Sequence, residues 1–350
     1  MERLNVNKLL ELAISKNATD LHLVANQPPI LRIDGELTPA LLPTLKPEDL
    51  LEIIMSMLTD KQKETFQQNQ ELDFSYLALN DFYFRVNIHK EKGNLAATIR
   101  IMSRNIKTPF ELGLPSVVED LVKKRKGLII ISGSAGCGKT TTLTSLVDLV
   151  NRKRKCKIIT IEDPIEFVHD SKQSLIIQRE VGSDTLSFAN ALKYALRQDP
   201  DVVVVGEMRD PESISMVLTT AETGHLVITT LHSTNAIESI NRIIDVYPTG
   251  KQEQIRFQLS EALTAIISQA LVSKRDGIGR VLACEVLVAT LSVRNMIRRN
   301  ALQEIRGQME TGGDFGMQTI EQSLSKLVQQ DLITKSSAIE HSRYPNLLKC

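Results

Sequence analysis

The spacing of hydrophobic residues divides the 350-residue chain into two parts. In the first part, residues 1–103, apolar positions either alternate with polar ones or recur at helical spacing over short stretches. This pattern predicts helices at 7–16 and 47–58, and strands at 20–24, 71–79, 82–89 and 95–102, with a further pair of strands around an Asp-Gly turn in 30–37. A helix followed by clustered strands indicates a compact α+β domain.

The second part follows residues 104–114, which lose this periodicity, contain Pro109 and Gly113, and are predicted to form a linker. From residue 115 onward, almost wholly apolar segments at 127–132, 157–162, 201–206 and 225–230 are separated by helical patterns. Apolar strands of this kind are typical of a parallel sheet covered on both faces. The fold class is therefore predicted to be α/β, with domain boundaries at 1–103, 104–114 (linker), 115–285 (core) and 286–350 (helical C-terminal region).

Residues 133–140 read Gly-Ser-Ala-Gly-Cys-Gly-Lys-Thr, the spacing of a phosphate-binding loop, between a predicted strand and a predicted helix. Glycines let backbone amides turn toward phosphate oxygens, and a helix N-terminus favours an anion. Lys139 is expected to reach the β- and γ-phosphates, and Thr140 to ligate Mg²⁺. The predicted cofactors are thus ATP and Mg²⁺. The loop residues predicted to bind the nucleotide are Ser134, Ala135, Gly136, Cys137, Gly138, Lys139, Thr140 and Thr141.

Acidic residues follow two of the predicted strands. The apolar run 201–206 leads into Glu207, which is predicted to polarise the attacking water, with a helix-capping glutamate as the alternative. Glu162, Asp163 and Glu166 follow the strand at 157–162. Three carboxylates this close suit a metal ion and its bound water, so Glu162 and Asp163 are predicted metal residues beside Thr140. The alternative, that Asp-Pro at 163–164 only makes a turn, stays open.

His225 and His232 flank the strand-like run Leu226–Leu231. A histidine at either end could hydrogen-bond a γ-phosphate, but spacing alone favours ordinary core residues with satisfied hydrogen bonds.

Composition excludes several classes of protein. Lys and Arg total 42, as do Asp and Glu, so no overall charge favours nucleic acid or a membrane surface. No apolar stretch approaches the roughly 18 residues of a membrane span, and the first residues show no signal pattern. The four cysteines form no Cys-x-x-Cys pair, which favours a reducing cytoplasm over a zinc site or a disulfide framework. Cys137, inside the loop, could make nucleotide binding sensitive to thiol reagents.

Four segments, in this order, resemble the motifs of the ATPase family that drives type II secretion and type IV pili. They are the phosphate loop, 159–167 (similar to the Asp box), 196–210 (similar to the Walker B signature) and 223–235 (similar to the His box). The resemblance covers nearly the whole chain. It implies a PAS-like N-terminal domain, a RecA-like P-loop domain and a homohexameric ring.

The resemblance also implies roles for individual residues. Arginines of the N-terminal domain are expected to close over the phosphates, which selects Arg85 and Arg100, although composition alone would leave both facing solvent. His225 is implied to bind the nucleotide. The catalytic residues implied are Glu207, Arg85, Arg100, His232 and Glu166.

Details within the motifs are similar to the branch of the family that retracts type IV pili. Met208 stands where extension ATPases tend to have isoleucine, Ser292–Arg298 resembles a C-terminal motif of the retraction branch, and no four-cysteine zinc loop occurs. The implied function is a cytoplasmic hexameric ATPase that drives pilus retraction and twitching motility. It would lie peripherally at the inner membrane, with a pilus platform protein and a second retraction ATPase as candidate partners. Alternatives are an ATPase of pilus assembly or type II secretion, a non-hydrolysing regulatory paralogue, and a DNA-translocating motor.

Two basic runs, Lys123–Lys126 and Arg152–Lys155, precede predicted strands. Solvated helix ends are the favoured interpretation, because basic side chains complement helix C-termini. The alternative is a cationic surface that meets an acidic loop of a membrane protein or anionic lipid. Few aromatic residues lie near these runs to stack bases, so no nucleic-acid partner is expected.

Overall fold

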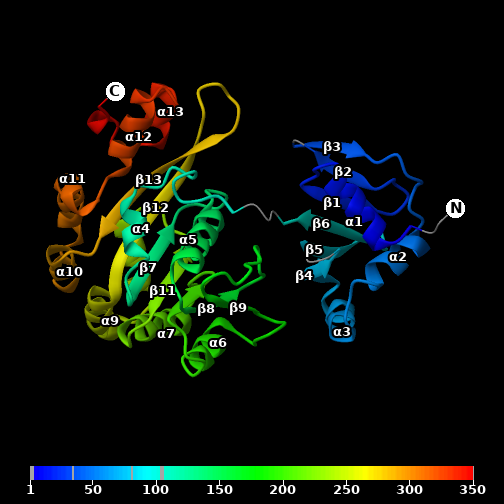
Figure 1. Cartoon of the computed structure of the whole chain (residues 1–350), viewed down its shortest axis with the longest axis horizontal. Helices are drawn as coiled ribbons and strands as arrows, with labels where there is room; N and C mark the ends of the chain where they lie inside the picture. Colours follow the sequence, from blue (N-terminus) through cyan, green and yellow to red (C-terminus); the bar gives the residue numbers. More distant parts are fainter. Residues whose placement is uncertain (1–3, 34, 80–81, 103–105, 350) are drawn as a thin grey trace. The chain divides into compact units, whose positions relative to one another are not determined.

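The computed structural model describes residues 4–33, 35–79, 82–102 and 106–349, and the chain divides into two compact units (Figure 1). The first unit comprises residues 1–104 together with 164–168, and the second comprises 105–163 and 169–350. The grouping of 164–168 with the first unit was not predicted. The Asp of the predicted Asp-Gly turn, Asp34, and the first two residues of the predicted linker, 104–105, lie outside the described residues.

The first unit contains a six-stranded antiparallel sheet in the order β3-β2-β1-β6-β5-β4. Its elements are α1 (Val6–Ser15), β1 (Asp20–Val24), β2 (Ile30–Ile33), β3 (Glu36–Pro39), α2 (Pro47–Met55), α3 (Asp60–Asn69), β4 (Glu71–Ala78), β5 (Phe82–Glu91) and β6 (Asn94–Ile101). Alternate residues of β5, Phe84, Val86 and Ile88, are buried in one core with apolar side chains of the three helices. The intervening residues, on the other face of the sheet, are polar.

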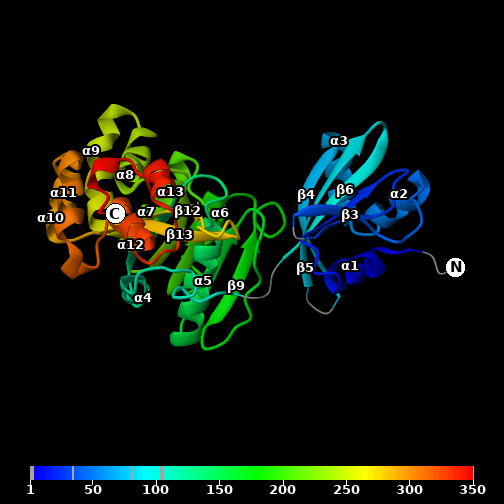
Figure 2. The ribbon, with the colours of Figure 1, turned by 90° about the horizontal axis from the view of Figure 1, so that it is seen from above.

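The second unit contains a seven-stranded sheet in the order β13-β12-β7-β11-β10-β8-β9. Figure 2 shows this unit from above and labels β9, β12 and β13. Its strands are β7 (Gly127–Ser132), β8 (Lys157–Glu162), β9 (Leu175–Glu180), β10 (Val202–Val205), β11 (Leu226–Leu231), β12 (Leu263–Ser273) and β13 (Arg280–Val288). All neighbours from β12 to β9 pair in parallel, and β13 pairs with β12 in the antiparallel sense.

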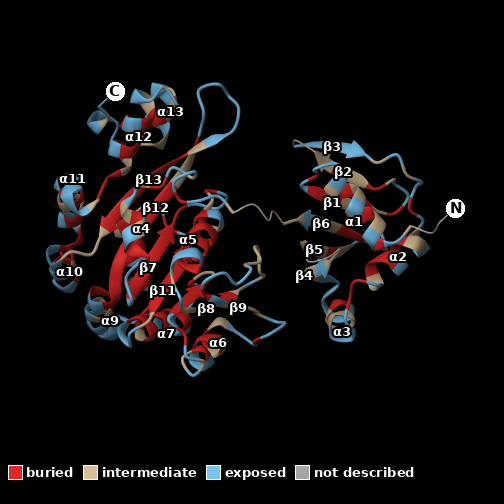
Figure 3. Ribbon diagram, in the orientation of Figure 1, coloured by how far each residue is buried: buried red, intermediate tan, exposed pale blue. Residues whose placement is uncertain are grey.

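Helices cover both faces of this sheet. They are α4 (Val117–Leu121), α5 (Lys139–Lys153), α6 (Phe188–Ala195), α7 (Pro211–Glu222), α8 (Ala236–Asp245), α9 (Thr249–Ala262), α10 (Leu291–Arg298), α11 (Ile305–Thr311), α12 (Ile320–Gln329) and α13 (Lys335–His341). Residues of β7 alternate between two cores: Leu128 and Ile130 pack with α6–α11, and Ile129 and Ile131 with α4 and α5. The strands at the centre of the sheet are therefore buried along their whole length (Figure 3).

The prediction of a mixed α/β chain is confirmed, whereas the PAS-like and RecA-like identities stay predictions. Helix α3 and strands β9, β12 and β13 were not predicted. Helix α3 buries only Phe66, so its sequence shows no helical spacing of apolar residues. The feature that could have predicted it is the capping box of Thr59 and Gln62 at its start. Strand β12 is a nearly continuous apolar run, which periodicity alone cannot distinguish from a buried helix. Strand β13 also continues past the predicted boundary at 285.

Candidate nucleotide site

The candidate site lies at the carboxyl-terminal edge of the parallel strands. Adjacent strands β7, β11, β10 and β8 all end there, and each is followed by residues predicted to act on a nucleotide. This edge is the usual binding crevice of an open parallel sheet. The phosphate loop follows β7, Glu207 follows β10, His232 follows β11, and Glu162 ends β8.

The phosphate loop turns directly from β7 into α5, as its glycine pattern predicts. Gly133 has a φ of +150°, and a Cβ there would lie 2.4 Å from Cys137 Sγ and 2.5 Å from the Gln269 carbonyl oxygen. No larger residue fits this position. Helix α5 begins at Lys139, so its first amides face the loop.

Lys139 folds back over the loop. Its ammonium donates to the carbonyl oxygens of Gly133 at 2.9 Å and Ser134 at 2.8 Å, and lies 3.5 Å from His232 Nδ1. The side chain is buried, and this burial lowers the pKa of Lys139 from its ordinary value, against the opposing effect of Cys137. The cation therefore lies inside the curve of the loop, next to the amides that would bind phosphate.

His232 connects Lys139 to Glu207. Because an ammonium can only donate, His232 Nδ1 must accept from Lys139, and the ring proton of the neutral imidazole is then on Nε2. Nε2 lies 3.4 Å from Glu207 Oε2. Burial, and then the charges of Lys139, Arg242 and Arg209, lower the pKa of His232. The local charges thus favour the neutral form of the ring, and the contact with Lys139 selects its tautomer.

Glu207 is mostly covered and lies among cations. Arg209 Nε forms an ion pair with Glu207 Oε1, and the other end of the Arg209 guanidinium is 4.0 Å from Asp163 Oδ2. The position is fixed by the backbone, because Thr230 Oγ1 donates to the Gly206 carbonyl at 2.6 Å and ties the end of β10 to β11. Arg209 was not among the predicted site residues, although it lies only two positions after Glu207.

The predicted metal residues do not form a ready-made metal cage. Glu162 Oε1 accepts from Thr160 Oγ1 at 2.6 Å and from Gln178 Nε2 at 3.1 Å, and Asp163 is partly exposed. Within 4–33, 35–79, 82–102 and 106–349, no group of three His, Cys, Asp or Glu side chains could hold a metal by itself. Thr140, the second residue of α5, stands next to the loop amides. This donor set suits Mg²⁺, which takes few protein ligands and completes its shell with phosphate oxygens and water.

The remaining predicted catalytic residues belong to the first unit. Arg85 and Arg100 are direct cross-strand partners on β5 and β6, so both side chains lie on the polar face of that sheet. Arg100 Nε donates to Asp20 Oδ1 at 2.9 Å, and Asp20 is buried. Arg85 forms an ion pair with Glu166 at 3.5 Å. The two arginines therefore form one cationic row within their own unit.

His225 requires a correction. It precedes β11, whereas His232 follows it, so a strand of roughly 20 Å separates the two histidines. His225 Nδ1 lies 3.1 Å from the Thr220 carbonyl and 3.4 Å from Thr223 Oγ1. Within one chain, His225 therefore cannot reach a nucleotide on the phosphate loop. His225 is therefore an ordinary histidine with satisfied hydrogen bonds, which is the alternative that its position in the sequence favoured.

Gln269 of β12 is a loop-contacting residue that was not predicted. Its Nε2 donates to the Cys137 carbonyl at 2.7 Å, and its buried Oε1 has no hydrogen-bond partner among the residues that the structure describes. The neighbouring Ser268 hydroxyl bonds that of Ser132 at 2.6 Å. The sequence offered one indication of this contact, the polar pair Ser268 and Gln269 in an otherwise apolar run, since a buried polar group normally has a specific partner.

Cys137 itself is buried and its pKa is raised by that burial, so its predicted sensitivity to thiol reagents is not supported.

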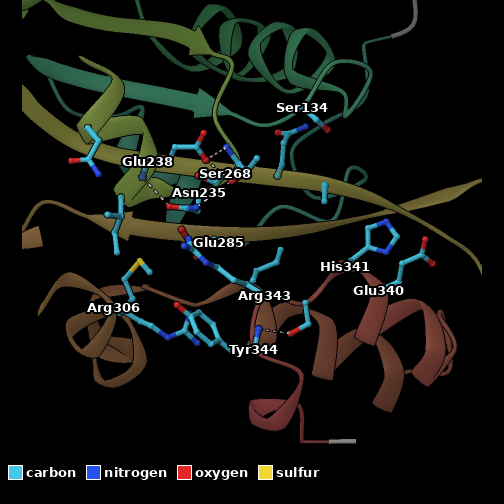
Figure 4. Close-up of a pocket in the computed structure, with 18 residues that line it drawn as sticks. Ser134, Asn235, Glu238, Ser268, Glu285, Arg306, Glu340, His341, Arg343 and Tyr344 are labelled. Atoms are coloured by element: carbon cyan, nitrogen blue, oxygen red, sulfur yellow. Dashed lines mark hydrogen bonds between the residues drawn. The ribbon is translucent and has the colours of Figure 1, made fainter. Parts of the chain in front are cut away.

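A cavity of about 630 Å³ adjoins the loop on the side of the C-terminal helices (Figure 4). Ser134 forms one wall, and Asn235 and Glu238 at the start of α8 form another. Glu285 is buried, accepts from the Ala236 amide at 2.8 Å, and has a pKa raised by burial. The cavity thus extends from the phosphate loop to the chain segment just after His232.

Comparison with known proteins identifies relatives over nearly the whole chain. The profile of the family described as "Type II/IV secretion system protein" matches residues 1–339. The "Twitching motility protein" of Neisseria gonorrhoeae is 46% identical, over 89% of this chain and 83% of its own. The "Type IV pilus retractation ATPase PilT" of Pseudomonas aeruginosa is 41% identical, over 98% of this chain and 99% of its own.

Solved structures agree with these relatives. A structure described as "Crystal Structure of the Pilus Retraction Motor PilT and Bound ADP" superimposes with a TM-score of 0.92 at 44% identity, covering 99% of both chains. The ATPase DotB of Legionella pneumophila shares the fold at 24% identity, with a TM-score of 0.77 over 97% of this chain and 96% of its own. The family resemblance noted in the motifs is confirmed. The chain belongs to the type II/IV secretion system protein family and is an ATPase of that family.

Proposed function

We propose that this chain is the motor ATPase of type IV pilus retraction in twitching motility. Two relatives that are similar over most of their length carry names for that process. The observation that carries hydrolysis is the contact series Lys139–His232–Glu207 at the end of the parallel strands. It places a phosphate-binding cation, a neutral imidazole and a carboxylate around one point.

The phosphate loop would bind ATP through its backbone amides and Lys139. Lys139 would exchange its two loop carbonyls for β- and γ-phosphate oxygens, which are stronger acceptors because they are charged. Thr140 would hold Mg²⁺, which when bound would neutralise charge on the phosphates. Glu162 and Asp163, at the same edge of the sheet, would bind its waters. The loop therefore binds and orients the triphosphate without covalent chemistry.

Glu207 would orient the attacking water. As a mostly covered carboxylate paired with Arg209, its ionised form would accept a proton or a hydrogen bond from water. His232 would sense the γ-phosphate, because its Nε2 proton can turn from Glu207 to a phosphate oxygen when Lys139 moves. This exchange couples the state of the nucleotide to the segment that begins α8.

At the level of the molecule, we infer a PAS-like first unit and a RecA-like second unit that assemble as a homohexamer. In this arrangement Arg85, Arg100 and Glu166 would complete the nucleotide site when the units close, so that hydrolysis drives motion. The ring would work in the cytoplasm, at the inner membrane, against a pilus platform protein and together with a second retraction ATPase. No helix in the described part of the chain has the length and apolar character needed to cross a bilayer.

The first test compares Glu207→Gln with the parent and with Glu253→Gln, which changes an exposed carboxylate of α9 in the same way. We expect Glu207→Gln to bind fluorescent ATP normally and to lose at least about 100-fold in turnover, because it cannot accept a proton from water. Glu253→Gln should hydrolyse ATP at the parent rate. Parent-like turnover in Glu207→Gln would remove this residue from the mechanism.

A second test assigns the process. In a strain that lacks its retraction ATPase, the parent chain should restore twitching, and the Glu207→Gln chain should leave surface pili that do not retract. Loss of surface pili on deletion of this gene would instead indicate pilus assembly. Turnover stimulated by single-stranded DNA would indicate a translocating motor.

A further inference from the structure

A cationic surface lies at the edge of the second unit's sheet that is opposite the phosphate loop. We define it by eight basic residues, Lys123, Lys124, Arg125, Lys126, Arg152, Lys153, Arg154 and Lys155. The first four follow α4 and precede β7, and the last four end α5 and precede β8. The Arg154 guanidinium joins the two runs by donating to the carbonyl oxygens of Val122 and Lys124, both at 3.2 Å.

Local ion pairs account for only part of this charge. Lys123 pairs with Asp120 at 2.6 Å, Arg152 with Asp148 at 2.6 Å, and Lys153 with Glu119 at 2.9 Å. Within the described residues, the other five form no ion pair with an acidic side chain: Lys124, Arg125, Lys126, Arg154 and Lys155. All of these except Arg154, which is half-buried, are exposed. The three ion pairs and the two backbone hydrogen bonds of Arg154 therefore account for four of the eight cations. The other four leave a local excess of positive charge on a chain with a formal net charge of +0.

The surface is concave. One hollow of about 630 Å³ is lined by Lys123, Arg125, Arg152, Lys153, Arg154 and Gln173. A second, of about 520 Å³, shares Arg125 and Arg154 and continues past Lys155 to His225. Protruding anionic groups can therefore contact several cations at once. Asp201 also lines the second hollow, but its Oδ2 accepts from the Lys157 amide at 2.8 Å.

This surface cannot compete for the nucleotide. The basic runs end immediately before β7 and β8, and the nucleotide site lies after the same parallel strands, so roughly 20 Å of sheet separates them. Nothing in the phosphate chemistry of the site requires these cations. They need a separate explanation.

We propose that the cationic surface docks an acidic polypeptide segment of a partner protein. Charge complementarity selects an anion, and the concave form suits carboxylate side chains that project from a chain. Neither hollow is lined by Phe, Tyr, Trp or a large aliphatic side chain, and His225 is the one ring among the lining residues, which disfavours insertion into a bilayer and the stacking of successive nucleic-acid bases. This docking does not depend on the proposed function of the nucleotide site.

The test uses the full chain and a fluorescently labelled 20-residue poly-glutamate peptide, measured by anisotropy at 50 and 300 mM NaCl. The variant is Lys124→Glu/Arg125→Glu/Lys155→Glu. The matched control is Lys251→Glu/Lys274→Glu/Arg280→Glu, which makes the same charge change at exposed positions of the same unit. We expect saturable parent binding that weakens at high salt, at least about a tenfold loss in the first variant, and less than about a twofold change in the control.

ATP turnover without peptide should be equal in the parent and both variants, which separates this proposal from the nucleotide site and verifies folding. Equal peptide affinity in the two triple variants would overturn the proposal, as would peptide competition with ATP. The parent chain is also tested with vesicles that contain 30% anionic lipid and with a 20-nucleotide single strand of DNA. If it bound either of these and did not bind poly-glutamate, the surface would belong to a different class of partner and the proposal would be overturned.

Discussion

Gln269 links the phosphate loop to strand β12 through one buried hydrogen bond. The substitution Gln269→Glu keeps the shape of the side chain but removes the donor to the Cys137 carbonyl, and it brings two acceptors together. A buried carbonyl left without its donor costs about 1–3 kcal/mol. We expect ATP affinity to fall about tenfold or more, measured by titration with a fluorescent nucleotide.

Gln303→Glu is the control for this prediction, because Gln303 is exposed on the same unit. Its nucleotide affinity should equal that of the parent. If Gln269→Glu also bound ATP like the parent, the strand would support the loop by packing alone.

We expect acid to destabilise the second unit through His169. Burial lowers the pKa of His169 to about 4, with Asp148 opposing and Lys172 assisting the shift, and the backbone amide of His169 donates to Gln178 Oε1 at 2.7 Å. Because the folded chain favours the neutral ring, its contribution to stability is complete above the unfolded pKa of about 6.5. It is lost as the pH falls from about 6.5 to about 4, and amounts to about 3 kcal/mol.

The measurement is urea unfolding between pH 7 and pH 4 for the parent and for His169→Gln, which cannot be protonated. The free energy of unfolding should fall more steeply with acid in the parent. Parallel pH curves would show that His169 is solvated in solution.

At the scale of single residues, the sequence was informative where the chemistry is local. Lys139 and Thr140 follow from the loop pattern, and Glu207 follows from an apolar strand that ends in an acid. His232 was assigned by resemblance, but its tautomer could be stated only with the geometry, because it depends on Lys139, 93 positions away. His225 was assigned by resemblance, and the direction of β11 separates it from the loop of its own chain.

At the scale of elements, α10 holds the end of α9. The Arg294 guanidinium donates to the carbonyls of Ser260 at 2.6 Å, Glu261 at 2.5 Å and Leu263 at 2.7 Å, and its Nε donates to Ala289 at 3.1 Å. The carbonyls of Ser260, Glu261 and Leu263 belong to the last turn of α9 and the start of β12, where no further helical amide can bond them. The segment 292–298 that resembles a retraction motif therefore has a structural task in this chain.

The substitution Arg294→Lys keeps the charge but loses the planar set of donors, so several carbonyls lose their partner. We expect the chain to be destabilised by about 1–3 kcal/mol, seen as a melting temperature lower by several degrees. Arg299→Lys changes an exposed arginine of the same region and should melt like the parent. Equal melting of the two variants would contradict the capping role.

Elements with a clear period could be predicted from the sequence, and the β12–β13 hairpin could not. Strands β7, β8, β10 and β11 are apolar runs bounded by turns and helices. Strand β12 follows α9 without a break, since Leu263 is both the C-cap of the helix and the first residue of the strand. Only pairing with β7 and β13, which is long-range, determines that this run is extended.

At the scale of the whole molecule, the proposed hexameric ring implies that its subunits do not hydrolyse ATP independently of one another. If six chains share interfaces, mixing the parent with an excess of Glu207→Gln should lower turnover more steeply than the fraction of parent chains, because inactive neighbours block closure. The measurement is turnover against parent fraction at fixed total concentration. Glu253→Gln, used as the diluting chain, should leave turnover unchanged. A strictly linear decrease with Glu207→Gln would contradict cooperation between subunits.

The burial of the cysteines has a practical consequence. Cys137 and Cys284 are buried, and the pKa of each thiol is raised by that burial, to about 12 for Cys284, so neither reacts readily with a maleimide. Cys156 is half-buried and lines the second hollow of the cationic surface. In a Cys350→Ser variant, Cys156 is therefore the single labelling position. A dye attached there reports on the cationic surface while leaving the phosphate loop chemically untouched.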